Sequence, residues 1–247
     1  MPEDTCTPGP MTFEEFATEL DAVRPTHSRF QNFHDLIEAG YCSLARLTAT
    51  DPEFGARLER RCRSIMEGFP YRSQRALCNL FTRLWETVDP YTGSYLGDAH
   101  HEMKLQNLNP GAKQIFTPYH ICLDLAQQRI TKEDIEASLA RNRPLRVADV
   151  TSGSGAFLIA AARTVEELGF DPSTVMLATL IEKDSFCMQM GFLQCCFKDI
   201  PAICIHGDSL SGQYQEIAYT PTALRQSRRF STAEEGDPAT RRRPTLP

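Results

Sequence analysis

The stretch that decides the fold class is Val147-Ala148-Asp149-Val150-Thr151-Ser152-Gly153-Ser154-Gly155-Ala156-Phe157-Leu158-Ile159. Its first residues predict a buried strand that ends at Asp149, and its last residues predict an apolar helix. Gly153 and Gly155 allow backbone N–H groups to approach a ligand closely, and a helix N-terminus attracts a carboxylate or a phosphate. The same pattern also suits an ordinary strand–turn–helix corner, which needs glycine only in order to turn.

Two further apolar runs predict strands that end near acidic residues. Residues 175–181 lead into Glu182-Lys183-Asp184, and residues 200–205 lead into His206-Gly207-Asp208. The chain has no P-loop motif, and the third glycine of the dinucleotide fingerprint is absent. In an open α/β sheet, ligands bind at the carboxyl edge of the strands. We therefore expect an α/β fold whose acids meet at one edge, where they suit ribose hydroxyls and the exocyclic amine of adenine.

Four motifs occur in an order that resembles one enzyme family. The string Lys113-Gln114-Ile115-Phe116-Thr117-Pro118 is similar to the F-T-P segment of amino-methylating DNA methyltransferases, and residues 149–157 are similar to their D-P-x-C-G-S-G-x-F motif. A ribose-binding acid and G-D/N-S-L follow in that family, as Glu182 and residues 207–210 do here. The chain thus resembles adenine-specific (N6) DNA methyltransferases of the plasmid and phage type, over roughly residues 80–220.

The resemblance implies a partial S-adenosylmethionine-dependent methyltransferase fold, which is Rossmann-like and is preceded by a helical region. It also implies S-adenosyl-L-methionine as cofactor, DNA as partner, and methyl transfer to N6 of adenine. The implied cofactor-binding residues are Phe116, Thr117, Asp149, Gly153, Gly155, Glu182, Asp184 and Asp208. Phe116 and Thr117 would pack over the methionine end and Asp149 would lie near its amino group.

Other residues of the implied pocket have more specific roles. Glu182 would bind the ribose hydroxyls and Asp208 would accept a hydrogen bond from the adenine amine. Ile181 and Phe186 would enclose the adenine ring. We expect Phe157 to anchor the helix to the sheet rather than to contact the ligand.

The sequence departs from the family in two places. Val150 and Ser152 stand where the family has proline and cysteine. The [N/D]-P-P-[Y/F] tetrapeptide, which holds the target amino group and stacks on the flipped base, is absent, and Tyr219-Thr220-Pro221-Thr222 lacks the amide and the second proline. We therefore predict no catalytic residue. The chain is expected to be an adenine-specific DNA methyltransferase by resemblance, a degenerate relative that acts as a cofactor-binding or interaction module, or one half of a split enzyme completed by a protein partner.

Three regions are expected along the chain: a helical region over 1–110, an incomplete S-adenosylmethionine-binding domain over 111–222, and a disordered basic tail over 223–247. The string Thr12-Phe13-Glu14-Glu15 predicts a capping box, and further helices are expected over residues 51–66 and 73–88. Trp85 is expected in the core. Residues 213–223 predict one strand or a short helix.

Composition and charge limit which ligands, metal sites and membrane segments the chain is expected to have. A net charge of −6 gives no overall attraction to nucleic acid. The nine cysteines include no C-x-x-C pair, so we expect no metal site and a cytoplasmic protein, and no apolar run approaches the roughly 18 residues of a membrane span. His100-His101-Glu102 is interpreted as a solvated helix face. Arg141, Arg143 and Arg146 suit either an ordinary charged loop or contacts to phosphates.

Overall fold

The computed structural model describes residues 10–105 and 116–234, with 231–234 described by their backbone alone. The expected boundary between 110 and 111, the first half of the string 113–118, and residues 235–247 of the expected basic tail lie outside the described residues.

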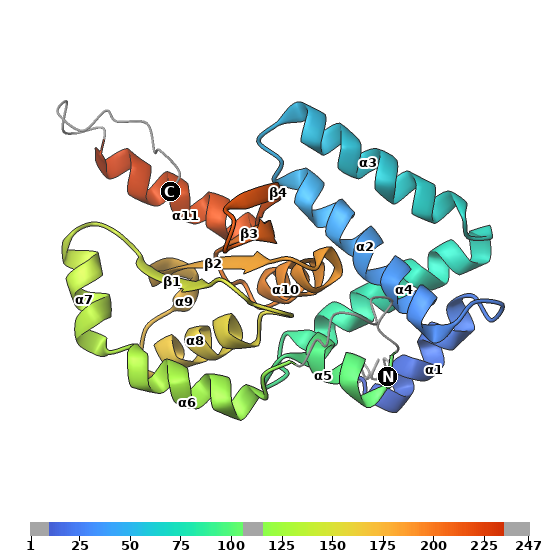
Figure 1. Ribbon diagram of the computed structural model, residues 1–247, viewed down its shortest axis with the longest axis horizontal. Helices are drawn as coiled ribbons and strands as arrows, with labels where there is room; N and C mark the ends of the chain where they lie inside the picture. Colours follow the sequence, from blue (N-terminus) through green and yellow to red (C-terminus); the bar gives the residue numbers. More distant parts are fainter. Residues whose placement is uncertain (1–9, 106–115, 235–247) are drawn as a thin grey trace, which may run out of the picture.

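A four-stranded mixed sheet forms the centre of the α/β fold (Figure 1). The strands are β1 (Leu145–Asp149), β2 (Met176–Glu182), β3 (Ala202–Asp208) and β4 (Gln213–Tyr219). Their order in the sheet is β1-β2-β3-β4, with the first three parallel and β4 antiparallel to β3. The three expected strands and their acidic ends are confirmed, and the architecture is compatible with a Rossmann-like fold.

Two helices connect the parallel strands and cover one face of the sheet. They are α8 (Ala156–Glu167) and α10 (Ser185–Phe197), and a single turn, α9 (Pro172–Val175), leads into β2. Right-handed crossovers between strands added in one direction place both helices on the same face, and α8 and α10 contact each other. Every residue of α10 from Cys187 to Phe197 is buried, which is typical of a helix packed on all sides.

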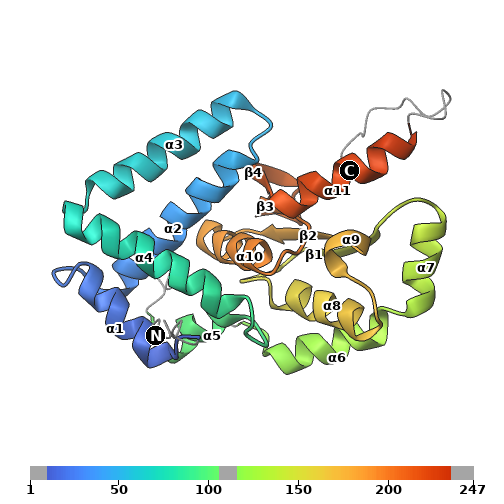
Figure 2. The same ribbon diagram turned by 180° about the vertical axis from the view of Figure 1, so that it is seen from behind.

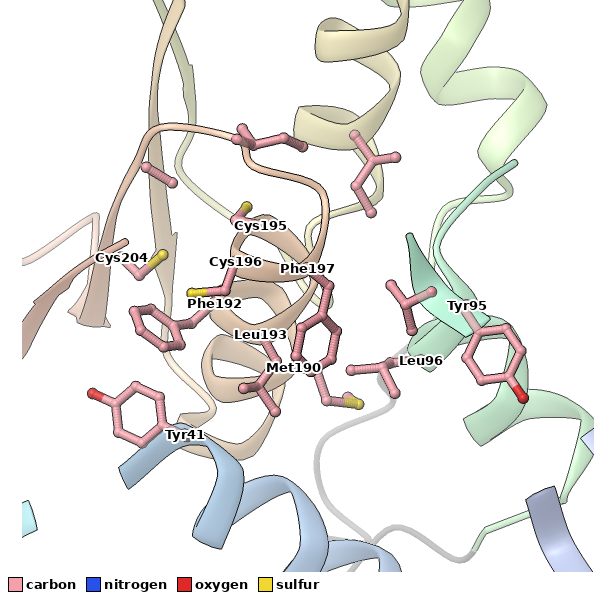
Figure 3. Close-up of a cluster of buried hydrophobic side chains, with 14 of the residues drawn as sticks. Tyr41, Tyr95, Leu96, Met190, Phe192, Leu193, Cys195, Cys196, Phe197 and Cys204 are labelled. Atoms are coloured by element: carbon pink, nitrogen blue, oxygen red, sulfur yellow. The ribbon is translucent and has the colours of Figure 1, made fainter. Parts of the chain in front are cut away.

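In the described residues 10–105, where a helical region was expected, the chain forms five helices that pack on the far side of α10 from the sheet. They are α1 (Phe13–Val23), α2 (Arg29–Leu47), α3 (Pro52–Glu67), α4 (Tyr71–Val88) and α5 (Tyr95–Glu102). Both views place them together at one end of the molecule, with α7 and α11 toward the other end (Figures 1 and 2). Figure 3 shows Met190, Phe192 and Phe197 of α10 between Tyr41 of α2 and Tyr95 of α5.

The predicted helix starts in this region are confirmed, but the predicted position of Trp85 is not. The capping box at Thr12 and Glu15 is confirmed, and α3 begins after Asp51, whose side chain caps it. The core position expected for Trp85 is wrong, because 42% of this residue is exposed. The Trp85 ring packs against Phe197, with 5.1 Å between ring centroids. Trp85 therefore lies at the edge of the core, on the apolar side of its helix, and remains partly exposed to solvent.

The remaining helices pack on α8, on α9 and on strands β1 and β3. Helices α6 (Tyr119–Arg129) and α7 (Lys132–Ala140) precede β1, and α6 packs along α8. After β4, which confirms a strand in residues 213–223, helix α11 spans Pro221–Glu234. The disorder expected from residue 223 onward is therefore wrong as far as 234. Buried Ala223 and Gln226 fix this helix, and the Gln226 amide donates to the carbonyl of Met176.

Candidate functional site

The glycine turn after β1 adopts a backbone that favours glycine at both positions. Gly153 has φ +53° and Gly155 has φ +89°, and Gly155 is the N-cap of α8. A Cβ on Gly155 would lie 3.3 Å from the Cα of Gly191 in α10, and one on Gly153 would lie 3.2 Å from the ring of Phe116. Both glycines are thus required by conformation and by close packing. The turn therefore also acts as an ordinary strand–turn–helix corner, which was the alternative interpretation of the sequence.

A cavity of about 370 Å³ lies beside the carboxyl end of β1. Its lining comes from the segment before α6, from α6 itself, from the β1 end and glycine turn, and from the first turn of α8. These residues are Phe116, Thr117, Cys122, Leu125, residues 148–154, Ala156 and Phe157. Phe157 packs on the core, as expected of a helix anchor, and it also lines the cavity.

Asp149 supplies a half-buried carboxylate to this cavity. Its Oδ1 accepts a hydrogen bond from the N–H of Thr151 at 3.1 Å. Burial raises the pKa of Asp149 and the nearby Glu182 carboxylate adds to the rise, while the Thr151 N–H opposes it. An anion here is poorly solvated and has a second acid beside it, so a cationic group bound in the cavity would stabilise it.

Glu182 joins the end of β2 to the glycine turn. Its Oε2 accepts from the N–H of Gly153 and its Oε1 from the N–H of Asp184, both at 2.8 Å. Asp184 is the N-cap of α10 and accepts from the N–H of Cys187 at 3.0 Å. Both acids thus hold backbone in place around the turn, and neither lines the cavity.

The residues expected to hold adenine lie away from the cavity. Asp208 accepts from the N–H of Leu210 at 2.9 Å and from the Lys183 ammonium at 3.2 Å, and these bonds lower the pKa of its exposed carboxyl. Phe186 stacks on His34 of α2, with 5.0 Å between ring centroids. Of the eight predicted residues, the structure brings Phe116, Thr117, Asp149 and Gly153 together around the cavity, and places Gly155, Glu182, Asp184 and Asp208 outside its lining.

A buried polar network behind the glycine turn was not predicted from the sequence. The Gln194 side chain is fully buried, and its amide donates to the Ser154 carbonyl at 2.7 Å and to Ser94 Oγ at 3.0 Å. Its Oε1 accepts from the N–H of Leu96 at 3.0 Å, and the hydroxyls of Ser94 and Ser154 lie 3.0 Å apart. The network fixes the turn between α5 and α10. The available signal was a single glutamine within the otherwise apolar end of α10, residues 190–197.

His100 also differs from its expected position on a solvated helix face. It is half-buried, and its ring meets the edge of Phe116 with 5.6 Å between centroids. Burial lowers the pKa of His100, so its neutral form is favoured. His101 and Glu102 are exposed, as expected. The histidine supports Phe116, which in turn packs against the glycine turn.

Comparison with models of protein families, with curated proteins and with solved structures finds no match for this chain. Within residues 10–105 and 116–234, no helix combines the length and the apolar character that crossing a bilayer requires. The same residues contain no group of three or more histidine, cysteine or acidic side chains arranged to hold a metal ion.

Proposed function

We propose that this chain binds S-adenosylmethionine at the carboxyl end of β1, as the cofactor-binding part of an adenine-N6 DNA methyltransferase system. The observation that carries the proposal is the cavity beside Asp149, which the glycine turn and the start of α8 enclose. It lies at the edge of the parallel strands where open α/β sheets bind their ligands. The ordered motifs that resemble the methyltransferase family specify which ligand we propose.

The chemistry of the cavity fits the methionine end of this cofactor. Gly155 caps α8 without a side chain, so the first N–H groups of the helix are available to a carboxylate. Burial raises the pKa of half-buried Asp149 and the nearby Glu182 carboxylate adds to the rise, so an anion here carries poorly solvated negative charge. An ammonium and a sulfonium group would offset that charge. Glu182 uses one lone pair of each oxygen on the turn, which leaves the others for ribose hydroxyls.

Methyl transfer requires a group that holds the target base. Bound S-adenosylmethionine would supply an electrophilic methyl group, and this chain's own residues would position it. The segment Tyr219–Thr222 has a structural role and is not available to bind a base. The Thr220 hydroxyl donates to the carbonyl of Ile200 and accepts from the N–H of Ala202. It lies at the amino end of β3, whereas the glycine turn lies at the carboxyl end of the sheet. We therefore propose that a partner polypeptide supplies the base-binding group.

A second candidate is a cofactor-binding module without transferase activity, which the absent tetrapeptide favours. The two functions differ in one assay. Purified chain is incubated with methyl-labelled S-adenosylmethionine and adenine-containing duplex DNA, alone and with a separate polypeptide that carries an N-P-P-Y segment. Label transferred to adenine in the combined sample supports the split enzyme, and cofactor binding without transfer supports the module.

Ligand class is tested by thermal denaturation of the chain with S-adenosylmethionine, S-adenosylhomocysteine, ATP or NAD. We expect the first two to raise the melting temperature, because a ligand that binds only the folded state stabilises it by mass action. We expect ATP and NAD to have little effect, since their phosphates would face the half-buried Asp149 carboxylate. Stabilisation by ATP or NAD alone would overturn the proposal.

A further inference from the structure

Strand β1 is the outermost strand of the sheet, and among the described residues no strand pairs with its outer edge. Backbone groups point alternately to the two sides of a strand. The N–H of Ala178 donates to Pro201 beside β3, so the backbone groups of the next residue, Thr179, face β1. Thr179 lies opposite Ala148, and in a parallel pair its N–H and C=O groups bond to the residues before and after Ala148, which are Val147 and Asp149. The N–H and C=O groups of Arg146 and Ala148 therefore face away from β2.

Apolar side chains surround this open edge. Val150, directly after β1, is 51% exposed, and Leu125 and Ile121 of α6 are 46% and 41% exposed. Leu125, Ala148 and Val150 all line the cavity beside Asp149. A strand added to β1 would satisfy the open backbone groups and cover these side chains, which is the usual mode of strand addition.

The charge at the edge selects one kind of occupant. Arg141, Arg143 and Arg146 are exposed, and within the part of the chain that the structure describes no ion pair involves them. These three arginines make the edge locally positive, although the whole chain has a net charge of −6. A second copy paired through β1 would bring two such arginine groups together, at an electrostatic cost. An acidic strand would instead complement them.

We propose that the outer edge of β1 binds an extended segment of another polypeptide, in which acidic residues alternate with β-branched apolar residues. The added strand lies beside β1, with its acids near the arginine group 141, 143 and 146 and its apolar residues over Leu125 and Val150. The interaction requires the backbone edge and the arginines, and it does not depend on the cofactor proposal.

The proposal is tested with a fluorescein-labelled peptide of sequence Glu-Val-Thr-Val-Glu-Ile-Glu, followed by fluorescence anisotropy without added cofactor. A peptide with lysine in place of each glutamate is the charge control. We expect the acidic peptide to bind at least about ten-fold more tightly, by an amount that falls as salt is added. Equal binding of the two peptides, or binding of neither, would overturn the proposal.

Two substitutions at one position separate the backbone from the charge. Arg146→Pro removes the outward N–H, in a place where an edge strand tolerates proline, and should abolish peptide binding. Arg146→Ala keeps that N–H and should weaken binding only a few-fold. Circular dichroism checks that both variants fold. If Arg146→Pro is unfolded, the triple variant with alanine at 141, 143 and 146 must still lose the preference for the acidic peptide.

Other occupants give different results. A homodimer in sedimentation equilibrium that Arg146→Pro dissociates would assign the edge to a second copy and overturn the proposal. Binding of duplex DNA that the triple arginine variant loses, without binding of the acidic peptide, would assign the arginines to phosphates and overturn it as well.

Discussion

Replacing Gln194 with leucine is expected to destabilise the fold strongly, through the polar groups that it leaves behind. Gln194 is fully buried and satisfies the N–H of Leu96 and the carbonyl of Ser154. The Ser94 hydroxyl keeps Ser154 Oγ as a partner. Two buried groups therefore lose their partners, at about 1–3 kcal/mol each, or about 2–6 kcal/mol in total. At about 2–4 °C per kcal/mol for a chain of this size, the melting temperature should fall by at least about 4 °C.

The matched control is Gln189→Leu in the same helix. Gln189 is 3% exposed, and its Oε1 accepts no hydrogen bond from any described residue. Removing an unsatisfied buried polar atom should cost little or even stabilise the chain. The two variants are compared by thermal and urea denaturation. A Gln194→Leu variant no less stable than Gln189→Leu would contradict the role assigned to the Gln194 amide.

Two further predictions concern the end of β1. Because burial raises the pKa of Asp149 in the folded chain, its stabilising contribution is present at low pH and is lost as pH rises through that raised value. Asp149→Asn should therefore raise the melting temperature of the ligand-free chain at pH 7.5, with a smaller gain at pH 5; an unchanged or lower value at pH 7.5 contradicts the assigned burial. Gly155→Ala should cost more stability than Gly169→Ala in urea denaturation. Both have positive φ, at +89° and +87°, but the new Cβ at Gly155 would press on Gly191, whereas at Gly169 no described residue beyond its chain neighbours lies within 4 Å of the new Cβ. Equal losses would show that conformation alone requires glycine, with a cost of roughly 1–2 kcal/mol.

The strands and the glycine turn were predictable because their signals are local. Apolar runs that end at Asp149, Glu182 and Asp208 lie in the sheet as expected, because a parallel sheet covered by helices needs such runs. The positive φ at Gly153 and Gly155 likewise follows from the residues themselves.

The partners of the acids were not predictable, because they depend on how the turn packs in three dimensions. Glu182 accepts from the Gly153 N–H, 29 residues away in the sequence, and Asp184 caps α10 instead of facing the cavity. Helix α11 was missed for a related reason. Its composition is that of a disordered tail, but three buried residues, Thr222, Ala223 and Gln226, are enough to dock its first turns on the sheet.

The most direct test of the central claim is calorimetric titration of S-adenosylmethionine into the purified chain, beside Asp149→Asn and Asp208→Asn. We expect saturable binding by the unmodified chain, a loss of roughly ten-fold or more in affinity with Asp149→Asn (about 1.4 kcal/mol), and a much smaller loss with Asp208→Asn. No heat of binding from well-folded protein, or a loss confined to Asp208→Asn, would contradict a cofactor site at the end of β1.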